Sequence, residues 1–267
     1  MRRFLVHGLL SVGVVSLLGA CGAKSNQGSA LKVTNGQLAT SKQYPSVVLL
    51  YDAKLGAMCT GTFVNETTVI SAAHCTEGGT VDAKGNVTGS PLSIISISDL
   101  AGGQASLVAT ATAEVRNIQW DKNGKNVNKY DLSLITFPAG TAKAVSALAD
   151  ASPSAGDDLT IVGYGLNQSD DLSDGSSAGV KRIGHNTVAV VSEGFIQFDG
   201  DSETTTANGT HSSASAGDSG GPLFINGKLA GITSGGGKAD ASSPDTTSLY
   251  IDVNSIESQA FLSTHLN

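Results

Sequence analysis

Aromatic and charged side chains are scarce in this sequence. Only 5% of the 267 residues are aromatic and 15% are charged, and there is a single Trp. So few charges argue against a coiled coil or an exposed helix bundle. A net charge of −7 without a basic patch argues against nucleic-acid binding. Gly is plentiful, with 33 residues, and 40% of the chain is hydrophobic, so we expect a globular all-β protein of many short strands and turns.

The first 32 residues differ in composition from the rest. They hold four of the 16 basic residues and none of the 23 acidic ones. Arg2 and Arg3 precede an apolar run at 4–18, which is short for a membrane span and typical of an export signal. The sequence LGAC at 18–21 resembles the lipobox of bacterial lipoproteins, which implies a signal peptide at 1–20 and lipidation of Cys21. The alternative is an ordinary signal peptide whose cleavage site lies beside a Cys.

Residues 21–32 are small and polar, as in a flexible tether or propeptide. With a lipid on Cys21 the protein would be exported and anchored at a bacterial cell envelope, or secreted after processing. Cys59 and Cys75 then remain as an even pair, which predicts one disulfide in an oxidising compartment. A metal site of Cys59, His74 and Cys75 lacks a fourth ligand and the usual paired-Cys spacing, so we expect no metal and no cofactor.

Short apolar runs bounded by turn residues recur along the chain. Asn226-Gly227 between two of them is typical of a hairpin. The polar stretches 167–179 and 199–215 are expected to be exposed loops. Only 255–266 has helical periodicity, with Ile256, Ala260 and Phe261 predicted to form its apolar face. The runs predicted as strands are 46–51, 61–64, 68–72, 92–98, 132–137, 159–163, 188–191, 194–198, 222–225, 228–233 and 248–253.

Three segments carry side chains suited to nucleophilic catalysis. They are SAAHC at 71–75, YDLSLI at 130–135 and GDSGGP at 217–222. In this order they resemble the trypsin/chymotrypsin family of serine proteases, in which His, Asp and Ser follow one another along the chain. The resemblance extends over residues 33–267, through VTNG at 33–36, where the family's mature N-terminus lies, and GYG at 163–165. It implies two six-stranded antiparallel β-barrels split near 138–150, an active site between them, and a C-terminal helix.

The resemblance also assigns roles. Ser219 is the nucleophile, His74 the general base and acid, and Asp131 the residue that orients the imidazole and stabilises its cation. The backbone N–H groups of Gly217 and Ser219 form the oxyanion hole. Ser234 supports Asp131.

The specificity pocket departs from the pattern of tryptic members. Those have an Asp at the pocket floor, where this chain has Ser213, and many relatives close the pocket with a disulfide that this chain lacks. By resemblance Ser234, Gly236 and Ser248 also line the pocket. A buried Arg or Lys side chain would be unpaired there, so we expect cleavage after apolar residues.

Activation in this family depends on a new N-terminal amine. Here a cut between Lys32 and Val33 would free the Val33 amine to pair with Asp218, so the uncut chain is predicted to be a zymogen. The same cut would separate the domain from Cys21. The expected partners are protein or peptide substrates and an activating protease, with no nucleic acid, and we expect a monomer.

Two other functions compete with this one. The first is an inactive family member that serves as a binding module, although such proteins usually lose a triad residue or the oxyanion glycine. The second is a serine hydrolase of another fold, which predicts the order Ser, Asp, His along the chain; here the three motifs follow in the order His, Asp, Ser.

The remaining histidines and acidic clusters give little indication of a metal-binding site. The histidines outside the triad segment show no ligand spacing, and the clusters do not follow the twelve-residue calcium loop. We therefore expect surface histidines and no calcium site. The residues concerned are His185, His211 and His265, and Asp170, Asp171, Asp174, Asp199, Asp201 and Glu203.

Overall fold

A computed structural model describes residues 33–40, 42–97, 104–121, 128–167, 178–238 and 242–266. The regular secondary structure of these residues is almost entirely β, with one 3-10 turn, η1 (Ala73–Thr76), and one helix, α1 (Ile256–His265). In this described part no helix has the length and apolar character needed to cross a membrane. The strands are β1 (Gln37–Leu38), β2 (Val47–Asp52), β3 (Ala57–Phe63), β4 (Thr68–Ser71), β5 (Thr80–Val81), β6 (Val87–Thr88), β7 (Ser93–Ile97), β8 (Ala105–Thr110), β9 (Ala113–Arg116), β10 (Ser133–Thr136), β11 (Asp158–Gly163), β12 (Arg182–Thr187), β13 (Val190–Ser192), β14 (Phe195–Asp201), β15 (Pro222–Ile225), β16 (Lys228–Gly237) and β17 (Asp245–Asp252).

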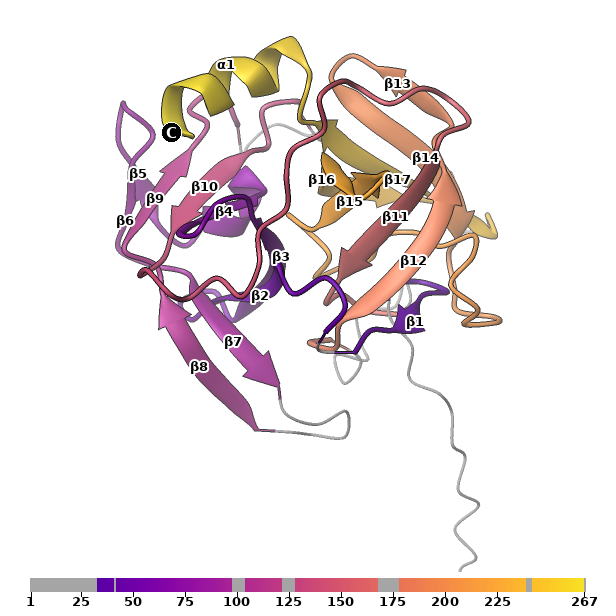
Figure 1. The fold of residues 1–267 in the computed structure, drawn as a ribbon, viewed down its shortest axis with the longest axis horizontal. Helices are drawn as coiled ribbons and strands as arrows, with labels where there is room; N and C mark the ends of the chain where they lie inside the picture. Colours follow the sequence, from indigo (N-terminus) through magenta and orange to yellow (C-terminus); the bar gives the residue numbers. More distant parts are fainter. Residues whose placement is uncertain are drawn as a thin grey trace, which may run out of the picture.

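The first half of the molecule is a curled antiparallel sheet in the order β8-β7-β2-β3-β4-β10-β9, with the pair β5-β6 beside it (Figure 1). Apolar side chains of its strands point into a common core, in which Phe63 and Phe137 meet edge to face. Leu50, Val69 and Ile135 are fully buried there. Burial of such side chains contributes about 2 kcal/mol each, so this core holds the half together.

The second half is another curled antiparallel sheet, in the order β1-β12-β11-β15-β16-β17-β14-β13. Asn226 and Gly227 both have positive φ at the tight turn between β15 and β16, as the Asn-Gly signal predicted. Phe198 and Tyr250 stack in its core. The sheets have seven and eight strands instead of six each, and in the second sheet the short strands β1 and β13 form the two edges.

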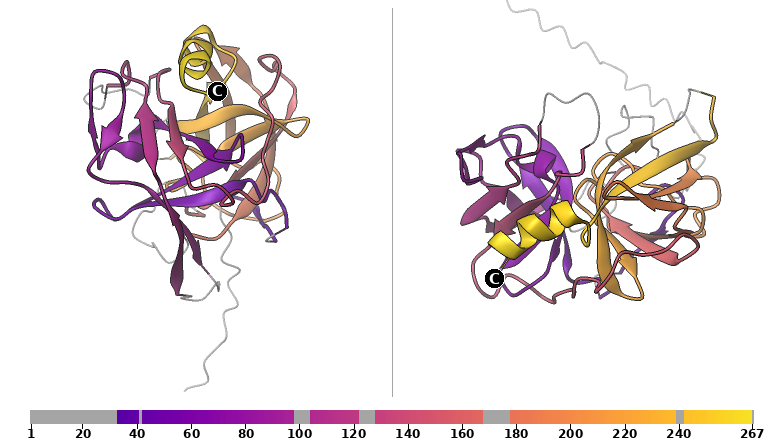
Figure 2. Two further views of the ribbon diagram at one scale, coloured as in Figure 1. Left: turned by 60° about the vertical axis from the view of Figure 1, so that its left-hand side comes forward. Right: turned by 90° about the horizontal axis from the view of Figure 1, so that it is seen from above.

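The two halves lie side by side, and the chain passes from one to the other between Thr136 and Asp158 (Figure 2). One apolar cluster joins them, with Ile70 and Leu132 from the first half and Val162 and Ile232 from the second. The end of β4, the start of β10 and the middle of β16 therefore lie at this junction, as do the three sequence motifs.

Some expectations about local structure were wrong. In α1, Ile256 is 85% exposed and Ala260 is also exposed, while Phe261 and Leu262 pack against the cluster between the halves. Ile256 is the first residue of the helix. The stretch 199–215 is not one exposed loop, because it begins within β14 and contains Ser213, which is fully buried. Strand β8 was not predicted, because its side chains are nearly all exposed and show no alternation.

Candidate active site

His74 and Asp131 are in direct contact. His74 lies in η1, which follows β4, and Asp131 lies just before β10, the strand that pairs with β4. One carboxylate oxygen of Asp131 accepts a hydrogen bond from the His74 backbone N–H at 2.9 Å, and the other lies 2.8 Å from His74 Nδ1. Asp131 is buried, whereas the His74 side chain is 28% exposed. The carboxylate thus fixes the ring and leaves Nε2 for proton transfer.

The charge of Asp131 also changes the basicity of the imidazole. Burial lowers the pKa of His74, but the hydrogen bond and the negative charge of Asp131 outweigh that effect, so the pKa is raised above its ordinary value. Ser234 Oγ, on β16 of the second half, donates a further hydrogen bond of 2.5 Å to Asp131 Oδ2. Side chains from both halves therefore hold the same carboxylate.

The turn that carries Ser219 is tied to both sheets. Thr60 of β3 donates from its backbone to the Ser219 carbonyl at 2.8 Å and from its hydroxyl to the Gly217 carbonyl at 2.9 Å. Gly217 and Gly220 have φ values of +96° and +76°, which side chains rarely adopt. A Cβ on Gly220 would overlap the Ser71 hydroxyl, so the turn packs tightly against the strand end that leads to His74.

Asp218 is buried in the same turn beside an arginine. Its carboxylate accepts hydrogen bonds from the backbone of Gly165 at 2.8 Å and Ser215 at 2.9 Å, and it occupies the space that a Cβ on Gly163 would need. Gly163 is directly opposite Arg182 in the pair β11–β12, and opposite residues point to the same face of a sheet. The fully buried Arg182 therefore extends on the face where the Asp218 carboxylate lies.

Arg182 was not anticipated from the sequence, because an arginine in a short strand usually indicates a solvent-exposed position. Burial lowers its pKa to about 9, and the charge of Asp218 opposes that decrease. Val33, the residue predicted to supply the partner of Asp218, is also buried, and Thr34 pairs with Ser213 through two backbone hydrogen bonds. Lys32 and Cys21 lie outside the described residues.

The residues predicted to form the specificity pocket lie on adjacent segments. Gly236 is opposite Ser248 in the pair β16–β17, and a Cβ on Gly236 would overlap the Thr247 carbonyl. The buried hydroxyl of Ser248 accepts a hydrogen bond from the Ala214 backbone at 3.0 Å, and Ser213 Oγ donates to the Asp201 carbonyl at 2.7 Å. Both hydroxyls are thus engaged by backbone groups.

The predicted disulfide is present. Cys59 of β3 is bonded to Cys75 of η1, with 6.1 Å between their Cα atoms. His74 lies beside the two sulfur atoms, but each sulfur is already bonded to the other. The bridge connects the strand that holds the Ser219 turn to the turn that carries His74.

The acidic residues weighed for calcium binding lie partly within the described residues. Asp201 lies with His211 and Asp245, not with Asp199 and Glu203. The other set, Asp170, Asp171 and Asp174, lies outside the described residues.

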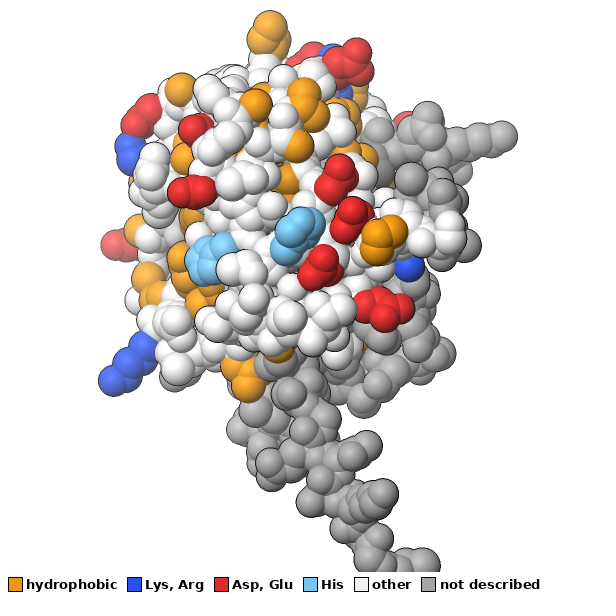
Figure 3. Space-filling view, turned by 90° about the vertical axis from the view of Figure 1, so that its right-hand side faces the viewer, with side chains coloured by type: hydrophobic (Ala, Val, Ile, Leu, Met, Phe, Trp, Pro, Cys, Tyr) orange, Lys and Arg blue, Asp and Glu red, His pale blue; other side chains and the backbone are white. Residues whose placement is uncertain are grey.

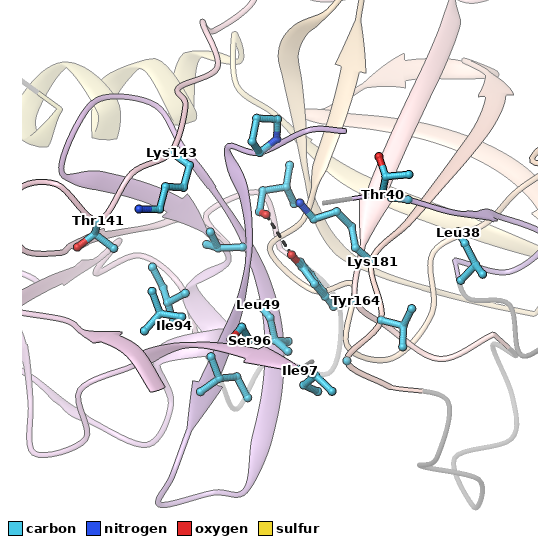
Figure 4. A pocket seen from close by; sticks show the side chains of 18 residues that line it. Leu38, Thr40, Leu49, Ile94, Ser96, Ile97, Thr141, Lys143, Tyr164 and Lys181 are labelled. Carbon is cyan, nitrogen blue, oxygen red and sulfur yellow. Dashed lines mark hydrogen bonds between the residues drawn. The ribbon is translucent and has the colours of Figure 1, made fainter. Parts of the chain in front are cut away.

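An apolar groove of about 630 Å³ is lined by none of His74, Asp131 and Ser219 (Figure 4). Leu49, Ile94 and Ile97 contribute apolar surface. Tyr164 Oη donates to the Val47 carbonyl at 3.2 Å, and Lys181 Nζ donates to the Tyr44 carbonyl at 2.9 Å. Burial lowers the pKa of Lys181 to about 8. No sequence motif predicted this groove, because its residues come from strands far apart in the chain.

Comparison with known proteins agrees with this architecture. A protein-family model described as Trypsin matches residues 33–259. The structure is similar to that of neuropsin, described as a serine protease expressed in the limbic system of mouse brain, with a TM-score of 0.62 and 18% sequence identity over 87% of this chain and 99% of neuropsin. At that identity the likeness supports the fold alone, and the predicted chymotrypsin-like fold is confirmed. No curated protein sequence gives a significant match.

Proposed function

Because this chain belongs to the trypsin family, we propose that it is a serine endopeptidase that cleaves proteins or peptides through an acyl-enzyme intermediate. The observation that supports this most is the buried Asp131 carboxylate 2.8 Å from His74 Nδ1, next to the glycine-rich turn that carries Ser219. A structural histidine does not need a buried carboxylate hydrogen-bonded to its ring, whereas a histidine that acts as general base for a serine nucleophile does.

Each step of the reaction has a residue suited to it. Ser219 Oγ attacks the scissile carbonyl carbon while His74 Nε2 takes the hydroxyl proton. Asp131 stabilises the imidazolium, and the N–H groups of Gly217 and Ser219 donate to the oxyanion, each contributing roughly 10²–10³ to the rate. His74 then protonates the leaving amine, and a water activated by His74 releases the acyl group from Ser219.

Labelling with a fluorophosphonate probe tests this proposal. The processed protein should react at Ser219, and the Ser219→Ala variant should not. Asp131→Asn should retain the fold and lose roughly 10⁴ in turnover, because the wrong imidazole tautomer is favoured. A folded protein that does not react would indicate the alternative, an inactive family member that serves as a binding module.

The proposed specificity is for apolar residues on the acyl side of the cleaved bond. Ser213 and Ser248 offer no charge, and their hydroxyls are engaged by backbone groups. A buried Arg or Lys side chain that leaves water needs a carboxylate partner. Profiling with a peptide library decides this, and a profile dominated by Arg or Lys would contradict it.

The proposal for location and control rests on the sequence. The protein would be exported and attached to the membrane by lipid on Cys21, and an activating protease would cut after Lys32. Asp218 and Val33 are both buried, as the pairing of the freed amine with Asp218 requires. Arg182 is the competing source of positive charge for Asp218, and it would allow the domain to work while anchored.

A further inference from the structure

Two carboxylates and one imidazole converge beside the specificity residues. Asp201 is the last residue of β14, and Asp245, the first residue of β17, is directly opposite it. His211 belongs to the connection between β14 and β15. One ligand atom from each of the three residues lies within 4.8 Å of the other two. Figure 3 shows this half of the molecule, with several acidic side chains gathered around one of two histidines.

The fold holds these groups in place through Asn35, which is 2% exposed. Its side-chain N–H₂ donates to Asp201 Oδ2 at 2.7 Å and to the Thr210 carbonyl, next to His211, at 2.9 Å. The Asp201 N–H also donates to the His211 carbonyl at 2.8 Å. One buried amide thus orients a carboxylate and the histidine loop together, and metal sites commonly use such an outer partner to orient their ligands.

The local charge favours a cation. Like charges directly opposite on neighbouring strands repel. In the described part of the chain, the basic side chain within ion-pair distance of Asp201 or Asp245 is His211, whose Nδ1 lies 3.5 Å from Asp201 Oδ1. With a neutral imidazole, the cluster carries two negative charges and a nitrogen lone pair.

We propose that Asp201, His211 and Asp245 bind a divalent transition-metal ion of the Zn²⁺ type. An imidazole nitrogen with carboxylates suits Zn²⁺, whereas Ca²⁺ and Mg²⁺ prefer oxygen ligands alone. Tetrahedral Zn²⁺ places its ligand atoms about 3.4 Å apart, close to the 3.5 Å between His211 and Asp201. The His211 side chain is 59% exposed, so water can complete the coordination.

The site is joined to the specificity residues, and its effect on catalysis rests on the proposed function. The Asp201 carbonyl accepts the hydrogen bond from Ser213 Oγ, and β17 leads from Asp245 to Ser248. A bound ion would hold the ends of β14 and β17 together beneath Ser213. Zn²⁺ would therefore change the KM for peptide substrates more than kcat.

Calorimetric titration with Zn²⁺ alone tests binding without any need for activity. Every protein in this titration is the full chain with Ser219→Ala, a substitution that prevents self-cleavage. His211→Gln and Asp245→Asn should each weaken the binding of one Zn²⁺ at least tenfold and remove the rise in unfolding temperature that Zn²⁺ causes. The matched control is His185→Gln, which changes an exposed histidine on β12 of the same half and should leave binding unchanged.

Each outcome decides the proposal. Unchanged Zn²⁺ binding in His211→Gln would overturn it, as would a wild-type chain that binds no Zn²⁺. Binding that is lost in His74→Ala but kept in His211→Gln would assign the ion to the triad histidine and also overturn it. Unfolding temperatures without metal show whether the variants fold. If Zn²⁺ binds as expected but the active chain cleaves no peptide, the metal site stands and the proposed function fails.

Discussion

Asp131 accepts hydrogen bonds from the His74 backbone, the His74 ring and the Ser234 hydroxyl. The first two orient the imidazole, and the third orients the carboxylate itself. Ser234 does not touch the reacting atoms, so it is a positioning residue. The resemblance to the trypsin/chymotrypsin family predicted Ser234 both as a support of Asp131 and as a residue that lines the specificity pocket. In the structure its hydroxyl contacts Asp131.

Ser234→Ala should lower kcat about tenfold with little change in KM, since a hydrogen bond to a charged group contributes roughly 1.5–3 kcal/mol. The acid limb of the rate profile should move to higher pH, because an Asp131 with one donor fewer interacts more strongly with the imidazolium. Steady-state kinetics from pH 5 to 9 measure both effects, and Ser234→Thr should restore them. A change confined to KM would assign Ser234 to the pocket instead.

Glu114 is a second residue whose environment has a measurable consequence, namely the pH dependence of stability. It is buried on β9, where its Oε1 accepts a hydrogen bond of 2.6 Å from the Leu92 backbone. Burial raises its pKa to about 7, with a further increase from the charge of Asp52. The folded protein thus favours neutral Glu114 more than the unfolded chain does.

This difference predicts a pH-dependent stability. The contribution of Glu114 is fully present below about pH 4.5 and is lost as the pH rises through about 7. Between pH 5 and 8 the free energy of unfolding should fall by about 2 kcal/mol more in the parent chain than in Glu114→Gln. Urea unfolding in a Ser219→Ala background measures this, and equal decreases in the two proteins would refute it.

Among the elements, the proposed active site depends on how β3, η1 and the turn that carries Ser219 are joined. The Cys59–Cys75 bridge connects β3 to η1 across a sequence separation of 16 residues. Thr60, beside Cys59, holds the Ser219 turn through two hydrogen bonds. The bridge therefore fixes the position of the His74 segment relative to the Ser219 turn.

Replacing both Cys59 and Cys75 by Ser should lower the free energy of unfolding by about 2–4 kcal/mol, mainly because the unfolded chain gains freedom. Chemical denaturation of the two proteins at one pH measures the difference. Cys21→Ser is the control and should leave stability unchanged, because Cys21 takes no part in the bridge. Thiol mapping that finds Cys75 free in the mature protein would contradict the prediction.

Activation of the complete protein depends on which group supplies positive charge to Asp218. Val33 begins the family match and is buried near the start of β12, while Arg182 is buried at the start of that strand. If the Val33 amine is required, the cut after Lys32 both activates the domain and separates it from Cys21. If Arg182 suffices, the anchored chain is active without any cut.

Lys32→Gln should therefore give an inactive precursor that stays with the membrane fraction, whereas Lys24→Gln, in the same tether, should be processed normally. Fluorophosphonate labelling and N-terminal sequencing of each fraction measure the result. Labelled, lipid-bound protein that still carries Lys32 would refute the zymogen. In that case Arg182→Gln should abolish the labelling, because Asp218 would lose its counter-charge.

The class of fold, the disulfide and the side chains proposed for catalysis could all be predicted from the sequence. Gly-rich turns, the Cys pair and the three motifs are local patterns, and their chemistry requires particular residue types at fixed spacing. Only the tertiary structure brought Arg182 to the face occupied by Asp218, and joined Asp201, His211 and Asp245 in one cluster. It also decided which residues of α1 are buried. Those outcomes depend on strand register and on packing between residues far apart in the chain, and no local pattern carries either.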